Sequence, residues 1–397
     1  MTDRPGKPSA IAPWAEDPLG YLIAPFDQGE FFARIYEREH LIAPHNDADR
    51  YASLISLEAI DRLIAGVDLR EGQLDLANAA RPVQKNAYVS GDGLIDRGVI
   101  ARQFQTGSTI ILQQMHQHDP TLARFCRALE HRFSCHVQTN IYATPPNAQG
   151  FRTHYDNHDV FVLQISGEKA WRLYDMPIEA PYRGEGFDPD EKKVGELRHE
   201  FVLKAGDCAY VPRGLMHDAI ASGEHPSLHI TVGLIVRTWA DLMLEAVSEV
   251  ALKHPAFRRA LPIGHTTREF DRAQARGYFR DLVATLSAEA APDAALDLMI
   301  DGFIRSRIPD TSGAIAEAAR PIGAEDMFRV RPFTPWRLAE DGDKLVLIAP
   351  GGDVDFKPDE RAAVERALAG AAFKLADIGG EEDLVRKLHA FGLITRA

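Results

Sequence analysis

The chain has 397 residues, 45% of them hydrophobic, which is enough material for two or more domains with real cores and excludes a disordered chain. Its 45 Lys and Arg against 58 Asp and Glu give a net charge of -13, which disfavours nucleic acid and anionic membranes and favours basic partners such as ribosomal proteins or basic peptides. Because the sequence has no uninterrupted apolar run of about 18 residues and no apolar leader at its start, we expect a soluble, cytoplasmic protein that does not enter a membrane.

Residues 1–235 are expected to form the first domain, which begins with an α/β lead-in. Helical patterns cover residues 28–39 and 57–65, and the apolar run 109–113 suits a strand. Residues 120–133 carry apolar side chains at helical spacing. This pattern predicts a helix that packs on the outside of a sheet.

Short β-branched and aromatic runs separated by turns fill residues 137–234. Tight turns are expected at residues 166–169 and 204–207. Closely spaced strands without long intervening helices are typical of antiparallel barrels and jelly rolls. We therefore predict a mainly β fold with α elements, in which the core is a double-stranded β-helix of the jelly-roll or cupin type.

The remainder of the chain returns to helical spacing. Residues 236–330 contain three helical patterns and predict a helical region able to cap the barrel or pair with a second copy. Residues 331–397 have the order strand, helix, short segment, helix, which suggests a small winged-helix-like domain. The sequence thus predicts three segments, divided after residues 235 and 330.

The three cysteines, Cys126, Cys135 and Cys208, are too few and too scattered for a disulfide framework or a thiolate zinc site. We expect them to be reduced packing residues, which agrees with a cytoplasmic protein.

A possible metal site lies in the β-rich part of the sequence. His154 and Asp156 are two positions apart, so on a strand their side chains point to the same side. His217 follows the rigid turn Val-Pro-Arg-Gly on a later strand. Two imidazoles and one carboxylate on one face are typical of non-heme Fe(II) oxygenases, which keep open positions for an oxo-acid and O2.

Lys169 adds a second feature at the start of a predicted strand, where it alternates with Trp171 and Leu173. A lysine on an otherwise apolar inward face needs an anionic partner, such as the distal carboxylate of 2-oxoglutarate. The periodicity is equally compatible with a solvated turn lysine beside a surface Arg172.

Several linked motifs together resemble the JmjC-type ribosomal oxygenases, which are 2-oxoglutarate-dependent histidine or arginine hydroxylases of ribosomal proteins. The motifs are Asn140-Ile-Tyr142, Gln149-Gly-Phe, His154-Tyr-Asp156, Phe161-Val-Leu-Gln164, Gly167-Glu-Lys169-Ala-Trp171-Arg-Leu-Tyr174 and Val211-Pro-Arg-Gly214 with His217. The resemblance is closest over residues 137–231. It also covers the order of domains, because the family follows its barrel with a helical dimerisation region and a winged helix, and it thus implies a homodimer.

Carried over to this sequence, the resemblance implies that His154, Asp156 and His217 bind Fe(II) and that Lys169 binds the distal carboxylate of 2-oxoglutarate. It also implies that Asn140, Tyr142 and Thr231 line the co-substrate pocket. The reaction would consume O2 and hydroxylate a protein side chain. A lysine at position 169 resembles the histidine-hydroxylase branch, whereas the bacterial arginine hydroxylases tend to use arginine.

Other histidines are given different roles. His116 and His118 precede an expected helix start and are interpreted as loop residues in solvent. His158 is expected to face the substrate or the surface rather than to be a fourth ligand. His229 lies on an apolar strand and is interpreted as a satisfied core histidine.

Direct nucleic-acid binding is not expected, because residues 331–397 carry 10 Lys and Arg against 12 Asp and Glu and the candidate recognition helix begins with three acids. Two alternatives stay open at this point. The same chemistry could act on another protein or a biosynthetic peptide, or the barrel could be a cupin that binds metal without catalysis.

Overall fold

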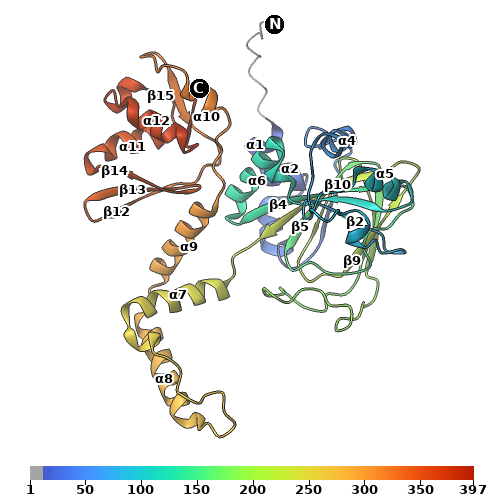
Figure 1. Cartoon of the computed structure of the whole chain (residues 1–397), viewed down its shortest axis with the longest axis horizontal. Coiled ribbons are helices and arrows are strands. Elements are labelled where there is room, and N and C mark those ends of the chain that lie inside the picture. Colours follow the sequence, from blue (N-terminus) through green and yellow to red (C-terminus); the bar gives the residue numbers. More distant parts are fainter. Residues whose placement is uncertain (1–11) are drawn as a thin grey trace. The chain divides into compact units, whose positions relative to one another are not determined.

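The computed structural model describes residues 12–397 (Figure 1). The expectation that the start of the chain carries no leader falls on residues outside the described part. The chain divides after Val236 into two compact units. Within the described residues, no helix is both long enough and apolar enough to cross a membrane.

The first unit consists of a helical lead-in and ten strands among its described residues. Its helices are α1 (Pro13–Glu16), α2 (Pro18–Ile23), α3 (Gln28–Glu30), α4 (Leu57–Gly66), α5 (Arg97–Gln105) and α6 (Pro120–Phe133). Its strands are β1 (Leu41–Ala43), β2 (Leu74–Ala77), β3 (Thr109–Leu112), β4 (His136–Thr144), β5 (Asp159–Ser166), β6 (Glu168–Leu173), β7 (His199–Lys204), β8 (Cys208–Val211), β9 (His217–Ser222) and β10 (Ser227–Ile235).

Two antiparallel sheets form the core of this unit. The larger sheet has the order β1-β8-β5-β10-β4-β3-β2 and the smaller one the order β7-β6-β9. Apolar side chains from both sheets meet in one buried cluster, in which Val162 and Ala209 of the larger sheet join Trp171 and Leu203 of the smaller one. The predicted mainly β fold with a double-stranded β-helix core is confirmed.

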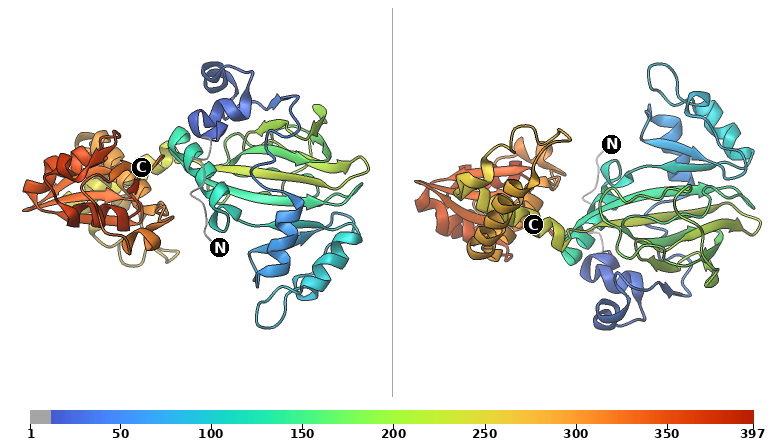
Figure 2. Two further views of the ribbon diagram at one scale, coloured as in Figure 1. Left: turned by 90° about the horizontal axis from the view of Figure 1, so that it is seen from above. Right: turned by 90° about the horizontal axis from the view of Figure 1, so that it is seen from below.

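Several helices of the first unit lie at the edges of the larger sheet, whereas α6 packs on the inner strand β4. In both views of Figure 2, the dark-blue N-terminal helices and the pair α4 and α5 lie at opposite ends of the sheet. Helix α6 begins at Pro120 because the Asp119 carboxylate accepts hydrogen bonds from the backbone N–H groups of Thr121 and Leu122. It buries Leu122 and Phe125 and ends at Phe133, before Ser134, which has a left-handed backbone conformation.

The second unit, Arg237–Ala397, begins with helices and ends with two small sheets. Its helices are α7 (Trp239–Lys253), α8 (Arg272–Glu289), α9 (Pro292–Ser306), α10 (Ala314–Ala318), α11 (Arg361–Leu368) and α12 (Glu382–Ala390). Its strands are β11 (Met327–Val330), β12 (Arg337–Asp341), β13 (Lys344–Ala349), β14 (Gly352–Phe356), β15 (Phe373–Lys374) and β16 (Ile394–Arg396). The sheets have the orders β12-β13-β14 and β15-β11-β16.

A single apolar core joins these small sheets to α11 and α12, with Phe328, Val364 and Leu388 among its buried residues. Helix α9 packs on β13 through Ile304, which contacts Val346 and Ile348. The helical region is therefore in contact with the C-terminal sheets. The winged-helix assignment and the finer boundary at residue 330 stay predictions.

Candidate metal centre

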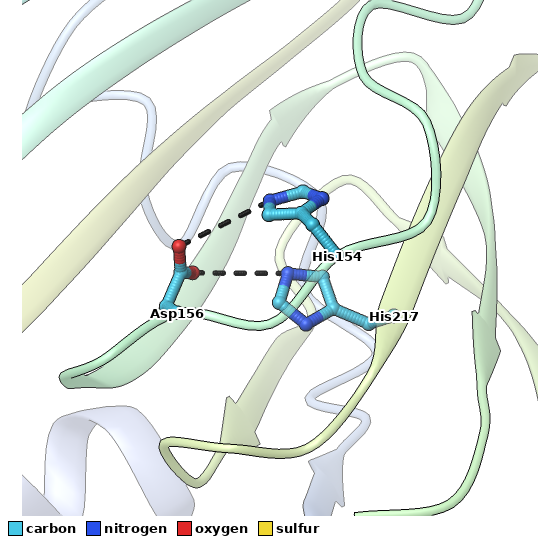
Figure 3. Close-up of side chains that lie close together, drawn as sticks. All are labelled: His154, Asp156 and His217. Atoms are coloured by element: carbon cyan, nitrogen blue, oxygen red, sulfur yellow. Dashed lines mark ion pairs between the residues drawn. The ribbon is translucent and has the colours of Figure 1, made fainter. Parts of the chain in front are cut away.

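Three side chains converge in the first unit. One ligand atom each from His154, Asp156 and His217 lies within 4.8 Å of the others (Figure 3). The Asp156 carboxylate is 4.0 Å from Nε2 of His154 and 3.7 Å from Nε2 of His217. Among residues 12–397, this is the one group of such side chains close enough to share a metal ion.

The two histidines are paired through their backbones. The N–H of His154 donates to the carbonyl of His217 at 3.0 Å, and the N–H of His217 donates back at 2.7 Å. This antiparallel pair joins the irregular segment 150–158 to the first residue of β9. The N–H of Gly214 also donates to the Asp156 carbonyl at 2.9 Å, so all three side chains are fixed by short backbone connections.

Backbone carbonyls orient both imidazole rings. Nδ1 of His154 is 2.8 Å from the Arg152 carbonyl, and Nδ1 of His217 is 3.0 Å from the Leu215 carbonyl. Because a carbonyl only accepts, each Nδ1 carries the proton and donates it. Each Nε2 therefore keeps its lone pair for a metal, in the arrangement that metal-binding histidines generally use.

The site favours the protonation states that bind metal. Burial raises the pKa of Asp156, but the imidazoles of His217, His158 and His154 outweigh it and hold the pKa below its usual value. Burial and the neighbouring His154 lower the pKa of His217. Asp156 is thus a carboxylate and His217 a neutral imidazole near neutral pH.

The cluster opens into a cavity between the two sheets, with about 700 Å³ of empty space including solvent at its mouth. Every residue that the sequence predicted for metal or co-substrate lines this cavity: His154, Asp156, His217, Lys169, Asn140, Tyr142 and Thr231.

Lys169 is 5% exposed, so the interpretation of this residue as a solvated turn lysine is wrong. Its Nζ lies 3.4 Å from Nδ1 of His229, which is also buried. Burial lowers the pKa of Lys169 to about 7, and burial together with Lys169 lowers the pKa of His229 well below its usual value. The cavity therefore contains a lysine whose cationic form a bound anion would stabilise.

The adjacent strands β4 and β10 supply further polar residues of the cavity. Asn140 and Thr231 are partners in the β-ladder, and Oδ1 of Asn140 accepts a hydrogen bond from the N–H of Gln114 at 2.9 Å. The Tyr142 ring stacks on His229 with a centroid separation of 4.7 Å and an angle of 5°. Burial, followed by the charge of Asp156, raises the pKa of Tyr142 to about 12, so its hydroxyl stays protonated.

Residues 111–242 match the family described as JmjC domain. We refer to these residues as the JmjC domain, after the family that they match. Human ribosomal oxygenase 1 is 32% identical over 326 residues, covering 76% of this chain and 50% of the human protein. The bifunctional lysine-specific demethylase and histidyl-hydroxylase NO66 of Drosophila grimshawi is 33% identical over 254 residues, covering 62% of this chain and 35% of the fly protein. The chain thus spans between a third and a half of the length of these relatives.

Solved structures agree on the fold. Escherichia coli ycfD superposes with a TM-score of 0.53 at 14% identity, covering 94% of this chain and 98% of that one. A structure of the same ribosomal oxygenase in complex with cobalt and 2-oxoglutarate gives 0.51 at 14% identity, covering 94% and 99%. The family resemblance predicted from the sequence is confirmed for the JmjC domain and its ribosomal oxygenase relatives.

The structure shows where three further histidines of the JmjC domain lie. His116 is tied to β4, because its ring Nδ1 accepts from the N–H of Thr139 and its own N–H donates to the Thr139 hydroxyl. His158 lines the cavity beside Gly233, where a Cβ would lie 2.6 Å from the imidazole Cδ2. His229 is buried as expected, yet it lines the cavity rather than an apolar core.

A buried ionic network that the sequence did not suggest supports the ligand segments of the JmjC domain. The Arg213 guanidinium is 2.7 Å from the Asp159 carboxylate and 2.6 Å from that of Glu37. The Tyr210 hydroxyl donates to Asp159 at 2.7 Å. Burial raises the pKa of Asp159 despite these partners. The network fixes the turn before His217 against the start of β5.

Proposed function

We propose that this chain is an Fe(II)- and 2-oxoglutarate-dependent dioxygenase that hydroxylates a protein side chain. The observation that carries the proposal is a ligand set of two histidines and one carboxylate in the same cavity as a buried lysine. Relatives named ribosomal oxygenase and histidyl-hydroxylase, and a neighbour solved with cobalt and 2-oxoglutarate, support it.

The donor set fits Fe(II). His154, Asp156 and His217 offer two neutral nitrogens and one carboxylate, which is the combination typical of non-heme iron oxygenases. When bound, Fe(II) together with 2-oxoglutarate and O2 supplies the oxidising chemistry that inserts one oxygen atom into a C–H bond. These three side chains would hold the metal and leave positions open on the cavity side.

Lys169 would bind the distal carboxylate of 2-oxoglutarate. An ammonium group that loses water contacts on burial gains most from a carboxylate, because the pair forms charge-assisted hydrogen bonds in a medium of low dielectric constant. Trp171 lines the same cavity, and its buried indole N–H has no hydrogen-bond partner among the described residues. Both groups favour a ligand with acceptor oxygens.

The cavity walls orient the co-substrate and limit water. Asn140, Tyr142 and Thr231 would contact 2-oxoglutarate from β4 and β10. Val160 and Ala219 add apolar surface on the remaining sides. A site with few water molecules strengthens the interaction of Lys169 with the carboxylate and suppresses side reactions of the oxidant.

The proposed substrate is a histidine or arginine side chain in a ribosomal protein. The human relative is named ribosomal oxygenase, and the fly relative is named both a histidyl-hydroxylase and a lysine-specific demethylase. Ribosomal proteins are basic, and the net charge of -13 on this chain favours such partners. Another protein or a biosynthetic peptide remains the second candidate.

We also infer that the protein acts as a cytoplasmic homodimer without direct nucleic-acid binding. Helix α7 exposes 83% of Trp239 and 58% of Met243, and apolar surface of this kind marks protein contacts. Cys126, Cys135 and Cys208 are all buried, as expected for packing residues of a cytoplasmic protein. Light scattering on the full chain tests the dimer.

Two experiments test the proposed activity. The purified protein with Fe(II) should convert 2-oxoglutarate to succinate, and a cupin that only binds metal would not. Mass spectrometry of ribosomal proteins from cells with and without the gene should then reveal one residue that gains the mass of an oxygen atom. Succinate formation without any modified ribosomal protein would favour the second candidate substrate.

A further inference from the structure

Asp218 directly follows His217 on β9, and its side chain is 2% exposed. Both carboxylate oxygens are occupied. One accepts from the Thr153 hydroxyl at 2.7 Å and from the Tyr174 hydroxyl at 2.8 Å. The other is 2.8 Å from Nε and 2.6 Å from Nη2 of Arg172. A buried carboxylate that accepts from four donors is the centre of a specific hydrogen-bond network, unlike an ion pair on the surface.

This cluster joins parts of the chain that carry the proposed ligands. Thr153 directly precedes His154 in the irregular segment 150–158, which no ladder of strand hydrogen bonds supports along its length. Arg172 faces Asp218 across the pairing of β6 with β9. The carboxylate thus links the segment of His154 to the strand of His217 through side chains.

The link lies beside the backbone pair of His154 and His217. Their ring centroids are 4.7 Å apart, and two backbone hydrogen bonds join them. The segment before His154 is otherwise held at Gln149 and Arg152, by hydrogen bonds with Ala79. The Thr153–Asp218 hydrogen bond restrains the segment one residue before the ligand. The Arg172 guanidinium pairs with Asp218, so the cluster adds no net charge beside the metal centre.

We propose that Asp218 is a positioning residue that clamps Thr153, and with it His154, against β9 and thereby sets the affinity of the site for its metal. The proposal rests on the proposed function of the triad. Supporting residues of this kind that orient metal ligands typically change metal affinity by about 10- to 100-fold when they are removed.

The test measures Co(II) binding to the metal-free, full-length protein by calorimetry and by visible absorption. Thr153→Val removes the hydroxyl but keeps the shape of the side chain, and it should weaken Co(II) binding by about tenfold. Thr153→Ser keeps the hydroxyl and should restore wild-type affinity. Thr285→Val is the matched control, because its hydroxyl bonds only to the Asp281 carbonyl on the exposed surface of α8.

Three outcomes would contradict the proposed positioning of Thr153 by Asp218. Wild-type affinity in Thr153→Val does so directly. Equal weakening in the Val and Ser variants would assign the effect to side-chain shape. Weakening in Thr285→Val would assign it to a general loss of stability. Failure of the triad is distinguished separately: if the wild-type protein binds Co(II) no better than His154→Ala does, the proposed function itself is overturned.

Asp218→Asn gives a second, independent measurement. It keeps the size of the side chain but removes the charge that holds Arg172, so a loss of Co(II) affinity at least as large as in Thr153→Val is expected. The Co(II) absorption spectrum should shift in both variants, because the geometry of the imidazole ligands changes. An unaltered spectrum in both would contradict the positioning role.

Discussion

Nζ of Lys169 lies 3.4 Å from Nδ1 of His229 inside the JmjC domain, and both side chains are buried. Burial lowers the pKa of the lysine to about 7, and burial together with Lys169 lowers the pKa of the histidine well below its usual value. Without a ligand, the lysine therefore loses its proton near neutral pH. Its charge becomes dependent on whether an anion is bound.

The first prediction concerns the pH dependence of co-substrate binding. Above pH 7 the ligand-free protein has lost the Lys169 proton, so binding of a dicarboxylate must take one up, and the affinity for 2-oxoglutarate should fall by up to about tenfold per pH unit between pH 7 and 9. Calorimetry in buffers of different ionisation enthalpy measures the proton uptake. Lys169→Met should bind weakly and take up no proton. A dissociation constant that is flat over this range would contradict the anchor role.

The second prediction concerns the free energy of unfolding, which should also depend on the protonation of Lys169. The folded pKa of about 7 lies below the ordinary value of 10.5, so between these values the unfolded chain binds more protons than the folded one. The contribution of Lys169 to the free energy of unfolding thus increases with pH above 7. Urea denaturation at pH 7 and 9 should show a smaller rise in Lys169→Met than in the wild type. The exposed Lys204→Met is the control, and the same reduction there would refute the assignment.

Removal of one ligand tests the metal centre. His217→Ala should lower the rate of succinate formation below detection, because only one imidazole and one carboxylate remain. Metal analysis and Co(II) titration give a measurement that is independent of turnover. His225→Ala changes an exposed histidine on the hairpin after β9 and should retain full activity. An active His217→Ala protein would end the proposal.

A fourth prediction concerns the turn between β7 and β8. Gly206 has φ +88°, and a Cβ there would lie 1.9 Å from the Asp47 carbonyl oxygen. Gly72 has nearly the same φ of +87° with nothing within 4 Å. Gly72→Ala should therefore cost about 1–2 kcal/mol for the backbone conformation alone, and Gly206→Ala at least about 3 kcal/mol, because the Asp47 segment must move. Equal denaturation midpoints of the Gly72→Ala and Gly206→Ala proteins would show that the Asp47 carbonyl does not exclude a side chain at position 206.

The strands and ligands were predictable because they rest on local patterns. Alternation along residues 168–173 allowed an inward or a solvated Lys169, and the structure shows that it is buried. The spacing of His154 and Asp156 predicted that both point to one side, and in the structure they lie beside His217. The helix at residues 120–133 was predicted to the residue, because Asp119-Pro120 is a strong start signal.

Periodicity could not tell a filled interior from a hollow one. It identified His229 as an inward residue, but whether that side of β10 meets packed side chains or a cavity depends on the opposite sheet. The Asp218 cluster was missed for a related reason, since its donors come from positions 153, 172 and 174, which are brought together only by the pairing of β6 with β9. Short strands such as β15, with two residues, leave too little pattern to detect.

The mutual backbone hydrogen bonds of His154 and His217 bear on the order in which folding and metal binding take place in the cell. The two imidazoles are brought together by chain pairing and carbonyl contacts, so the site is assembled by folding rather than by the metal. On the proposed function, iron would therefore bind to a site that folding has already formed. In a cell short of iron, newly made chains would then fold without the metal and become active when it is supplied.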